Sequence, residues 1–419
     1  MDSFYDRLIN RAATIDELLS DDFEAIPGEK DRAAFGQRRL AAWCQSAASG
    51  DWSLFGRRIE RDGLDSASVL ARLTAVRRKP AGPIPLWAAD ATWILPALEA
   101  TASKSAAELI GSKAEPVAFE HLLVGVVERA EALLQSATDG KTAANLTAPA
   151  YDCLRRALLT ELSELAAPAF YERFIAIRNA AETAAPRQDA PTSLYEKFVA
   201  EMKVGGFRQL FEEKPVLLRL ISTIVRQWVE TSREFIQRLD ADLPSIRSVV
   251  QAGGQGGVVQ IEGGFSDPHN GGRSVKIVIF ADGSKVVYKP KDLRVDVAWQ
   301  ELVDRLNRAT PPVELKTARA LAHDGYGWTA CIEHAGCVSP DEFNTFFRRV
   351  GAWLALFHCF AANDMHQENI VACFFSYAPF QLCFSIFQTG GKRGEVYRQN
   401  RGGTVHQGII TIGKVGNID

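Results

Sequence analysis

Apolar residues recur at helical spacing through most of the first 245 residues. The clearest case is Val216–Leu239, where apolar side chains fall three or four positions apart with charged residues between them. These apolar positions are Leu217, Leu220, Ile221, Ile224, Val225, Trp228, Phe235, Ile236 and Leu239. The pattern predicts an all-helical N-terminal region, residues 1–245. It leaves open whether this region is purely structural or binds a peptide or another substrate, because periodicity does not separate the two.

The pattern changes at Gln251, and eight glycines follow within residues 253–272. Two β-branched runs, 274–280 and 285–288, flank an Asp-Gly pair, which is a strong hairpin signal because the turn needs a positive φ. Beyond them we expect a helix, two strands and a longer helix, over residues 297–307, 315–322, 327–333 and 340–361. The apolar face expected for the longer helix is Phe343, Phe346, Phe347, Val350, Leu354 and Phe357. The predicted fold class is α+β.

Composition narrows the choice of protein class. With 419 residues, 48 basic and 51 acidic side chains, the chain is long enough for two or three domains and carries no surplus charge for wrapping nucleic acid. Seven cysteines without a CxxC pair favour reduced thiols in a cytoplasmic protein. The N-terminus carries acidic residues where a secretory signal needs a basic start, so no secretory signal is predicted. Residues 370–391 carry no charge, but we do not expect them to form an integral membrane segment.

The order of glycine loop, hairpin, helix, strands and long helix is typical of a kinase-type small lobe that leads into a large lobe. Lys289, at the end of the second hairpin strand, stands where such a lobe carries its phosphate-binding lysine. About 75 residues later, Asp364, His366 and Asn369 form a DxHxxN pattern after the long helix. Taken alone, each signal has an ordinary explanation, a surface lysine or a polar loop that caps a helix; their spacing favours a phosphotransferase.

A third motif, SDPHNGGRSV at residues 266–275, places Asp267 and His269 in the glycine-rich stretch, where a simple kinase has no use for them. With this motif, with KVVYKPKDLRVD and with DMHQENIVA, the chain resembles the dehydratase region of class II lanthipeptide synthetases, the LanM family. The resemblance covers roughly residues 190–372 and is diffuse before residue 150. It implies a lipid-kinase-like fold that uses ATP and Mg²⁺ to phosphorylate Ser and Thr of a ribosomally made precursor peptide. Elimination of the phosphate then gives dehydroalanine and dehydrobutyrine.

Carried over by motif, the resemblance implies a role for each matching residue. Lys289 would bind phosphate, Asp364 would act on the substrate hydroxyl with His366 in support, and Asn369 would be a metal ligand. Asp267 and His269 would serve the elimination. Arg273 is a candidate partner for the leaving phosphate, with a structural salt bridge as the alternative. Glu301 is a candidate ion-pair partner for Lys289, with a solvated helical glutamate as the alternative.

The chain departs from the family pattern after residue 372. A kinase needs a further acidic metal ligand soon after the catalytic loop, but residues 373–418 contain no Asp and only Glu395 as an acid. Strong phosphoryl transfer is therefore hard to justify. We interpret residues 373–419 as an atypical tail, from an altered reading frame or a truncated gene, with a lineage-specific tail as the competing explanation. The family's cyclase domain is not recognised in this sequence, so no zinc site is expected.

These boundaries give four predicted parts: a helical region (1–245), a small lobe (246–338), the start of a large lobe (339–372) and the tail (373–419). The leading functional hypothesis is an incomplete lanthipeptide dehydratase, whose partners would be the precursor peptide and a second chain that supplies the missing parts. No nucleic-acid partner is expected. The alternatives are a non-catalytic module that binds the leader peptide or a nucleotide, and a lipid-kinase-like phosphotransferase for small molecules.

Overall fold

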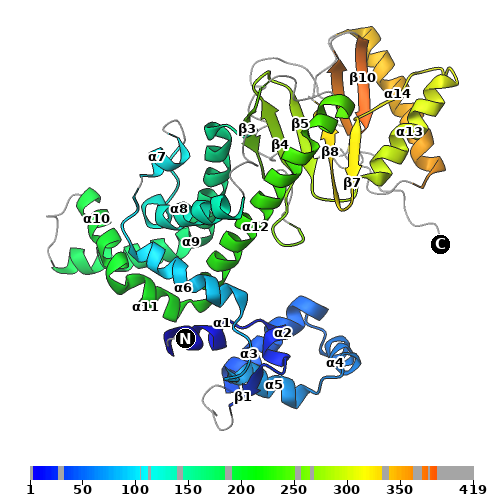
Figure 1. Cartoon of the computed structure of the whole chain (residues 1–419). Helices are drawn as coiled ribbons and strands as arrows, with labels where there is room; N and C mark the ends of the chain where they lie inside the picture. The colour runs from blue at the N-terminus through cyan, green and yellow to red at the C-terminus, as the bar shows by residue number, and fades with distance from the viewer. Residues whose placement is uncertain are drawn as a thin grey trace. The chain divides into compact units, whose positions relative to one another are not determined.

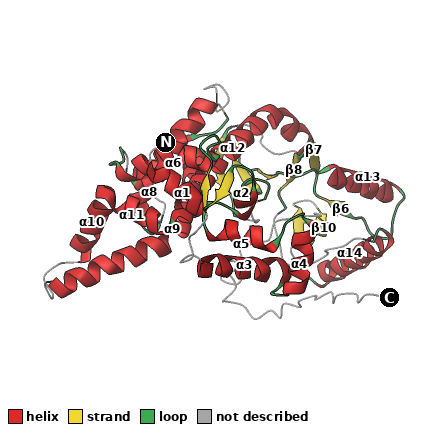
Figure 2. Cartoon of the chain, turned by 90° about the horizontal axis from the view of Figure 1, so that it is seen from below, coloured by secondary structure: helices red, strands yellow, loops and turns green. Residues whose placement is uncertain are grey.

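The computed structural model describes residues 3–26, 33–103, 105–111, 115–138, 145–184, 191–250, 256–264, 269–332, 339–361, 370–375 and 378–384. Helices dominate these residues and the larger sheet is antiparallel, which confirms the α+β class (Figure 2). The chain divides into two compact units, Met1–Ala130 with Leu158–Arg226, and Glu131–Ala157 with Gln227–Asp419. The second unit thus consists of two separate stretches of sequence: a helical one, Glu131–Ala157, and a longer one that contains the larger sheet, Gln227–Asp419.

The first unit is built mainly of helices joined by short loops. They are α1 (Ser3–Ala12), α2 (Ile15–Leu19), α3 (Ala33–Ala48), α4 (Trp52–Arg61), α5 (Ser66–Thr74), α6 (Leu86–Glu99), α7 (Ala106–Ile110), most of α8 (Glu120–Ala137) and α9 (Ala148–Ala184), α10 (Pro191–Glu201), α11 (Phe207–Glu213) and the start of α12 (Pro215–Ser245). The prediction of an all-helical region is wrong in one detail. Strands β1 (Phe23–Ala25) and β2 (Val76–Arg78) pair antiparallel, and three residues are too few to show alternation in a sequence.

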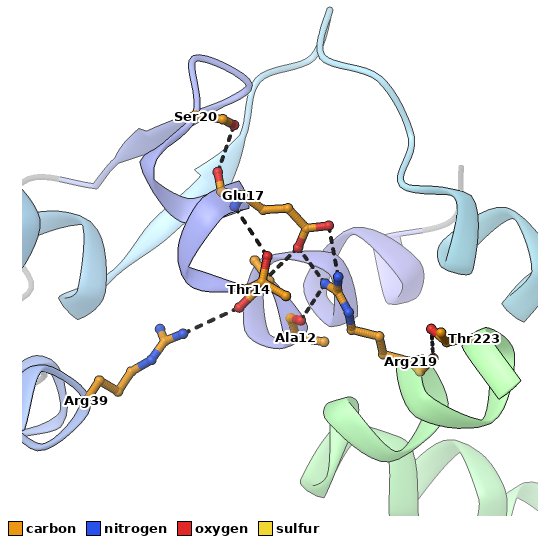
Figure 3. A network of polar contacts seen from close by, with 8 residues as sticks. Ala12, Thr14, Glu17, Ser20, Arg39, Arg219 and Thr223 are labelled. Carbon is orange, nitrogen blue, oxygen red and sulfur yellow. Dashed lines mark hydrogen bonds and ion pairs between the residues drawn. The ribbon is translucent and has the colours of Figure 1, made fainter. Parts of the chain in front are cut away.

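One polar network ties the start of α12 to α2 in this unit (Figure 3). Thr14 and Glu17 form a capping box, in which the Thr14 hydroxyl accepts from the Glu17 N–H and the Glu17 carboxylate accepts from the Thr14 N–H. Arg219 donates to both carboxylate oxygens of Glu17 and to the carbonyl of Ala12. A single glutamate therefore caps one helix and binds another that follows about 200 residues later in the chain.

The second unit contains a five-stranded antiparallel sheet in the order β3-β4-β5-β8-β7. Its strands are β3 (Val258–Glu262), β4 (Lys276–Phe280), β5 (Lys285–Lys289), β7 (Ala320–His323) and β8 (Tyr326–Ala330). The predicted hairpin is confirmed: β4 and β5 pair antiparallel around a turn in which Gly283 has a φ of 82°. Asp282 closes the turn by accepting from the Ser284 N–H at 2.9 Å.

The second part of α12 runs beside this sheet (Figure 1). Aromatic side chains make the contact between them. The ring of Phe235 lies 5.3 Å from that of Tyr288 on β5, and Tyr288 lies 5.0 Å from Trp328 on β8. These three side chains are buried, and the Trp328 indole N–H donates to Asp242 of α12 at 2.8 Å. The helix thereby fixes the centre of the sheet.

Helices α13 (Arg294–Arg308) and α14 (Pro340–Cys359) share a small core in the same unit. Val303, Leu315, Trp353 and Phe357 are its buried members, with Trp299, Phe346 and Val350 packed against them. The predicted apolar face of α14 is only half right, because Phe343, Phe347 and Leu354 are exposed. Helix α14 has two rows of apolar side chains. The row that contains Trp353 and Phe357 packs against Trp299 and Val303 of α13, and the row that contains Phe343, Phe347 and Leu354 is exposed.

Three strands make up a second sheet of this unit. Strand β10 (Ala378–Phe384) lies between β9 (Ile370–Phe375) and β6 (Lys316–Thr317), antiparallel to the first and parallel to the second. Part of the stretch predicted as an atypical tail is thus β-structure; its origin stays a prediction. Among the helices that the structure describes, none combines the length and the apolar character needed to cross a membrane.

Candidate functional site

Lys289 is the last residue of β5 and is buried, with 1% of its surface exposed. It pairs in register with Gly327 on β8. Gly327 leaves no room for a side chain, since an added Cβ would lie 2.4 Å from the carbonyl oxygen of Leu321 and 2.6 Å from a methyl group of Leu293. Leu293 is itself buried, so the segment that follows β5 turns back against β8. The strand end that carries Lys289 is therefore closely packed.

Burial disfavours the charged form of this lysine. It lowers the pKa of Lys289 from 10.5 to about 8, and the charge of Asp296 opposes that effect. Lys291 is half-buried nearby; burial and the charge of Lys289 lower its pKa to about 8. Burial raises the pKa of Asp296, while both lysines act to lower it. Two cations and one carboxylate thus interact at the end of β5.

The start of α13 brings Asp296 to this cluster. The Asp292 carboxylate accepts from the Arg294 N–H at 2.9 Å and from the Arg294 side chain, which fixes the turn into the helix. Asp296 then lies in the first helical turn, where a negative charge is favoured by the exposed N–H groups. Glu301, the candidate partner of Lys289 from the sequence, is exposed on the same helix. The carboxylate that acts on Lys289 comes five residues earlier.

The second group of predicted residues surrounds a tight loop. His269 and Arg273 face each other in an isolated bridge, in which each backbone N–H donates to the other's carbonyl, at 2.9 and 2.8 Å. Between them Asn270, Gly271 and Gly272 have φ values of 45°, 82° and 87°, a conformation that suits glycine and asparagine. An added Cβ on Gly272 would meet Gln227 of α12 at 2.9 Å. The loop therefore lies directly against α12, with the His269 side chain exposed.

Arg273 holds the same loop through a salt bridge. Its Nε and Nη2 donate to the two carboxylate oxygens of Glu234 at 2.8 and 3.2 Å, and Nη1 donates to the Asn270 carbonyl. The hydrogen bond from Arg273 to Glu234 raises the pKa of this arginine, although burial alone would lower it. Of the two roles open to Arg273 from the sequence, the structure therefore provides the contacts of the structural salt bridge.

The remaining predicted residues, Asp267, Asp364, His366 and Asn369, lie outside the described part of the chain. In sequence, the DxHxxN segment falls between the end of α14 at Cys359 and the start of β9 at Ile370. Within the residues that are described, no three His, Cys, Asp or Glu side chains come together as a metal site. The expectation that no zinc is bound stays a prediction, as does the role of Asn369 toward Mg²⁺.

Sequence reasoning missed Lys291, Asp296 and Glu234. The KPK spacing places a second lysine two residues after Lys289, and an acid in the first turn of a predicted helix is a common signal. Neither pattern reveals that the side chains interact. Glu234 carried no local signal, because a glutamate on a long amphipathic helix is usually solvated.

Comparison with known proteins adds two matches. Residues 215–374 match the family described as "Domain of unknown function (DUF4135)", a range that starts with α12 and ends in β9. The chain is also 21% identical over 196 residues to the "Lacticin 481/lactococcin biosynthesis protein LcnDR2" of Lactococcus lactis subsp. lactis. That alignment covers 44% of this chain and 21% of the relative, so the chain spans about a fifth of the length of the curated relative it matches.

The two matches confirm that this chain is similar to the LanM-like lanthipeptide synthetases. The DUF4135 range includes Lys289, Asp296, the loop from His269 to Arg273 and the DxHxxN segment. The structural features built around Lys289 and around Glu234 therefore lie within the matched domain.

Proposed function

We propose that this chain takes part in lanthipeptide biosynthesis, as the incomplete dehydratase inferred from the sequence, which acts on Ser and Thr of a precursor peptide with weak phosphoryl transfer. In the proposed reaction the substrate hydroxyl oxygen takes the terminal phosphoryl group of ATP and ADP is released. Removal of the α-proton then expels phosphate from the β-carbon and leaves the Cα=Cβ double bond of dehydroalanine or dehydrobutyrine. The similarity to a protein named for lacticin 481 and lactococcin biosynthesis supports the process; the two half-reactions are our proposal.

The observation that carries the proposal is the buried Lys289 at the end of β5, inside the DUF4135 match. A buried ammonium group is costly unless negative charge is close to it. Asp296 supplies one negative charge, but Lys291 adds a second positive charge to the same cluster. A phosphate of ATP at this strand end would place negative charge beside both ammonium groups, which supports Lys289 and Lys291 as the residues that hold the phosphate end of a nucleotide.

The phosphorylation step rests on residues of the matched domain. Lys289, with Lys291 beside it, would hold the phosphates, and Asp364 would orient the substrate hydroxyl and take its proton, with His366 in support. Asn369 is the residue proposed to hold Mg²⁺, which neutralises phosphate charge when bound. We propose that a lipid-kinase-like pair of lobes brings these groups together.

For the elimination step we propose Asp267 and His269. Proton removal next to a peptide carbonyl needs a base held at a fixed place, because a base that moves freely seldom meets the proton in a productive geometry. The exposed imidazole of His269 lies on a loop that is closed by backbone hydrogen bonds between His269 and Arg273 and is held to α12 by the Arg273–Glu234 salt bridge. A loop fixed in this way suits the role of a base. The phosphate leaves as the anion, so redox chemistry is not required.

The proposal is tested by incubating the protein with ATP, Mg²⁺ and the lacticin 481 precursor peptide, chosen because the curated relative is named for that product. Intact-mass spectrometry should show peptide that has lost water, with phosphorylated peptide as the intermediate. Asp364→Ala should leave the peptide unmodified, Asp267→Ala should accumulate phosphopeptide, and Asp304→Ala, at an exposed carboxylate on α13, should behave as wild type. Unmodified peptide from the wild type, with ATP bound, would favour a non-catalytic binding module.

A further inference from the structure

The loop from His269 to Arg273 is anchored to α12 at two points. Gly272 approaches Gln227, and the guanidinium of Arg273 forms its paired hydrogen bonds with Glu234, seven residues or about two helical turns further along. Residues seven apart lie on one face of a helix. Both anchors are therefore on the face of α12 that the loop covers, and His269 is at the other side of the bridge from Arg273.

A second arginine also donates to Glu234. Arg238, one turn later on α12, donates to Glu234 at 2.8 Å and to the hydroxyl of Tyr288 at 2.5 Å. Its guanidinium lies 4.0 Å from the centre of the Tyr326 ring, a cation–π contact. Tyr288 is the residue immediately before Lys289 on β5. One carboxylate thus joins, through two arginines, the His269 loop to the strand end that carries the buried lysine.

From this geometry we propose that Glu234 and Arg273 are positioning residues for elimination, which fix His269 relative to the phosphate-binding end of β5. This inference rests on the proposed function for its chemistry. Both half-reactions would act on one Ser or Thr side chain, so the base must be held near the place where the phosphate was received. A two-point salt bridge from an arginine supplies such a fixed orientation, because its planar fork allows little rotation.

The structural part of the inference is tested by hydrogen exchange on the full chain, with no substrate present. The amides of His269 and Arg273 donate across the loop and should be protected in the wild type. Glu234→Gln and Arg273→Gln should each speed their exchange about tenfold, because the paired, charge-assisted bonds are lost. Arg273→Lys keeps the charge without the fork and should give an intermediate rate. The double variant should exchange no faster than either single variant, because the two residues act as one unit.

Controls separate loop loosening from general unfolding. Amides of the β4–β5 hairpin should stay protected in every variant that supports the inference. Arg77→Gln breaks an exposed arginine–glutamate pair with Glu24 in the first unit and should leave loop exchange unchanged. If a Glu234 variant does not fold, Arg273→Lys provides the same test with the carboxylate in place. Unchanged loop exchange in both single glutamine variants would overturn the inference.

The catalytic part is tested with the peptide assay. Arg273→Gln and Glu234→Gln should form phosphopeptide at the wild-type rate but convert it to dehydrated peptide about tenfold more slowly, and Arg273→Lys should restore part of the conversion. Equal slowing of both steps would contradict a positioning role in elimination. If the wild type modifies no peptide while both glutamine variants still loosen the loop, the proposed function fails and the support of the loop by Glu234 stands.

Discussion

At the scale of single residues, Lys289 is the most informative side chain of the chain. Lysine is rarely buried, and a lysine that is 1% exposed at a strand end must be stabilised by negative charge or lose its own proton. Both effects are present: burial lowers the pKa of Lys289 to about 8, and Asp296 acts against that shift. The residue therefore holds a proton near neutral pH that it gives up more readily than an exposed lysine.

The lowered pKa predicts how stability depends on pH. An unfolded lysine keeps its proton up to its ordinary value of 10.5, whereas folded Lys289 loses it near 8, so the unfolded state binds more protons between these values. The free energy of unfolding should therefore rise with pH between about 8 and 10.5, by up to about 3 kcal/mol in all. Urea unfolding of the wild type from about pH 7.5 to about pH 9.5 measures the first part of this rise, about 2 kcal/mol.

Lys289→Met, which removes the charge and keeps the volume, should flatten the slope, although Lys291 contributes in the same direction. Lys285→Met, at the other end of β5, serves as the matched control and should keep the wild-type slope. An unchanged slope in Lys289→Met would show that the buried lysine is not the titrating group.

The two glycines of the His269 loop offer a second test at this scale. Both have a positive φ, but an added Cβ meets Gln227 at 2.9 Å only at Gly272; at Gly271 the nearest atom is an Arg273 nitrogen at 3.8 Å. Gly271→Ala should cost about 1 kcal/mol of strain, and Gly272→Ala about 1–3 kcal/mol more, because of the overlap with α12. Chemical denaturation of the two variants compares them. Equal losses would mean that the loop does not rest on the helix.

At the scale of elements, α12 has residues in each unit, and its charged side chains form hydrogen bonds within each of them. Near its start Arg219 binds Glu17 of α2, and further along Glu234, Arg238 and Asp242 recur every four residues toward the loop and the sheet. This spacing places the three acidic and basic groups on one side of the helix. The hydrophobic face that predicted the helix is thus accompanied by a polar stripe with specific partners.

The Glu17 pair predicts acid sensitivity of the first unit. Burial alone would raise the pKa of Glu17, but hydrogen bonds from Arg219 and Thr14 outweigh it, so the pKa lies below its ordinary 4.5. The stabilisation is complete above about pH 4.5 and is lost as the pH falls through the folded pKa. Glu17→Gln should therefore lose less stability than the wild type between about pH 5 and pH 3.

Thermal unfolding across this pH range measures the difference. Glu24→Gln is the matched control, because Glu24 also pairs with an arginine but its side chain is 39% exposed, and such pairs contribute little. A Glu17→Gln variant that loses stability in acid as steeply as the wild type would contradict the assigned network.

Local signals in the sequence predicted several elements correctly, whereas interactions between elements were not predictable. The Asp282-Gly283 turn is set by its own residues, so the hairpin followed from the pattern. Glu301 and Asp296 are five residues apart, which places them about 140° apart around α13, and helix phase is not known to that precision from a sequence. The same reason explains why Phe347 was expected in the core of α14 and is exposed.

At the scale of the whole molecule, the matched domain coincides with the elements that carry the site. Residues 215–374 include α12, the five-stranded sheet, α13 and α14, while the first 214 residues lie outside the match. The second unit also contains residues Glu131–Ala157, which precede the match. In this stretch Leu146 forms a β-bridge with Val258 of β3, and the Leu154 carbonyl accepts a hydrogen bond from the Trp228 indole of α12. The unit that holds the site thus extends beyond the matched sequence.

The central claim, that the buried lysine binds the phosphates of ATP, is tested most directly by titrating the protein with a fluorescent ATP analogue (mant-ATP) and Mg²⁺. Wild type and Lys285→Met should bind alike, and Lys289→Met should bind about tenfold more weakly or worse, because a charge-assisted contact contributes about 1.5–3 kcal/mol. Equal affinity of Lys289→Met and wild type would contradict the claim.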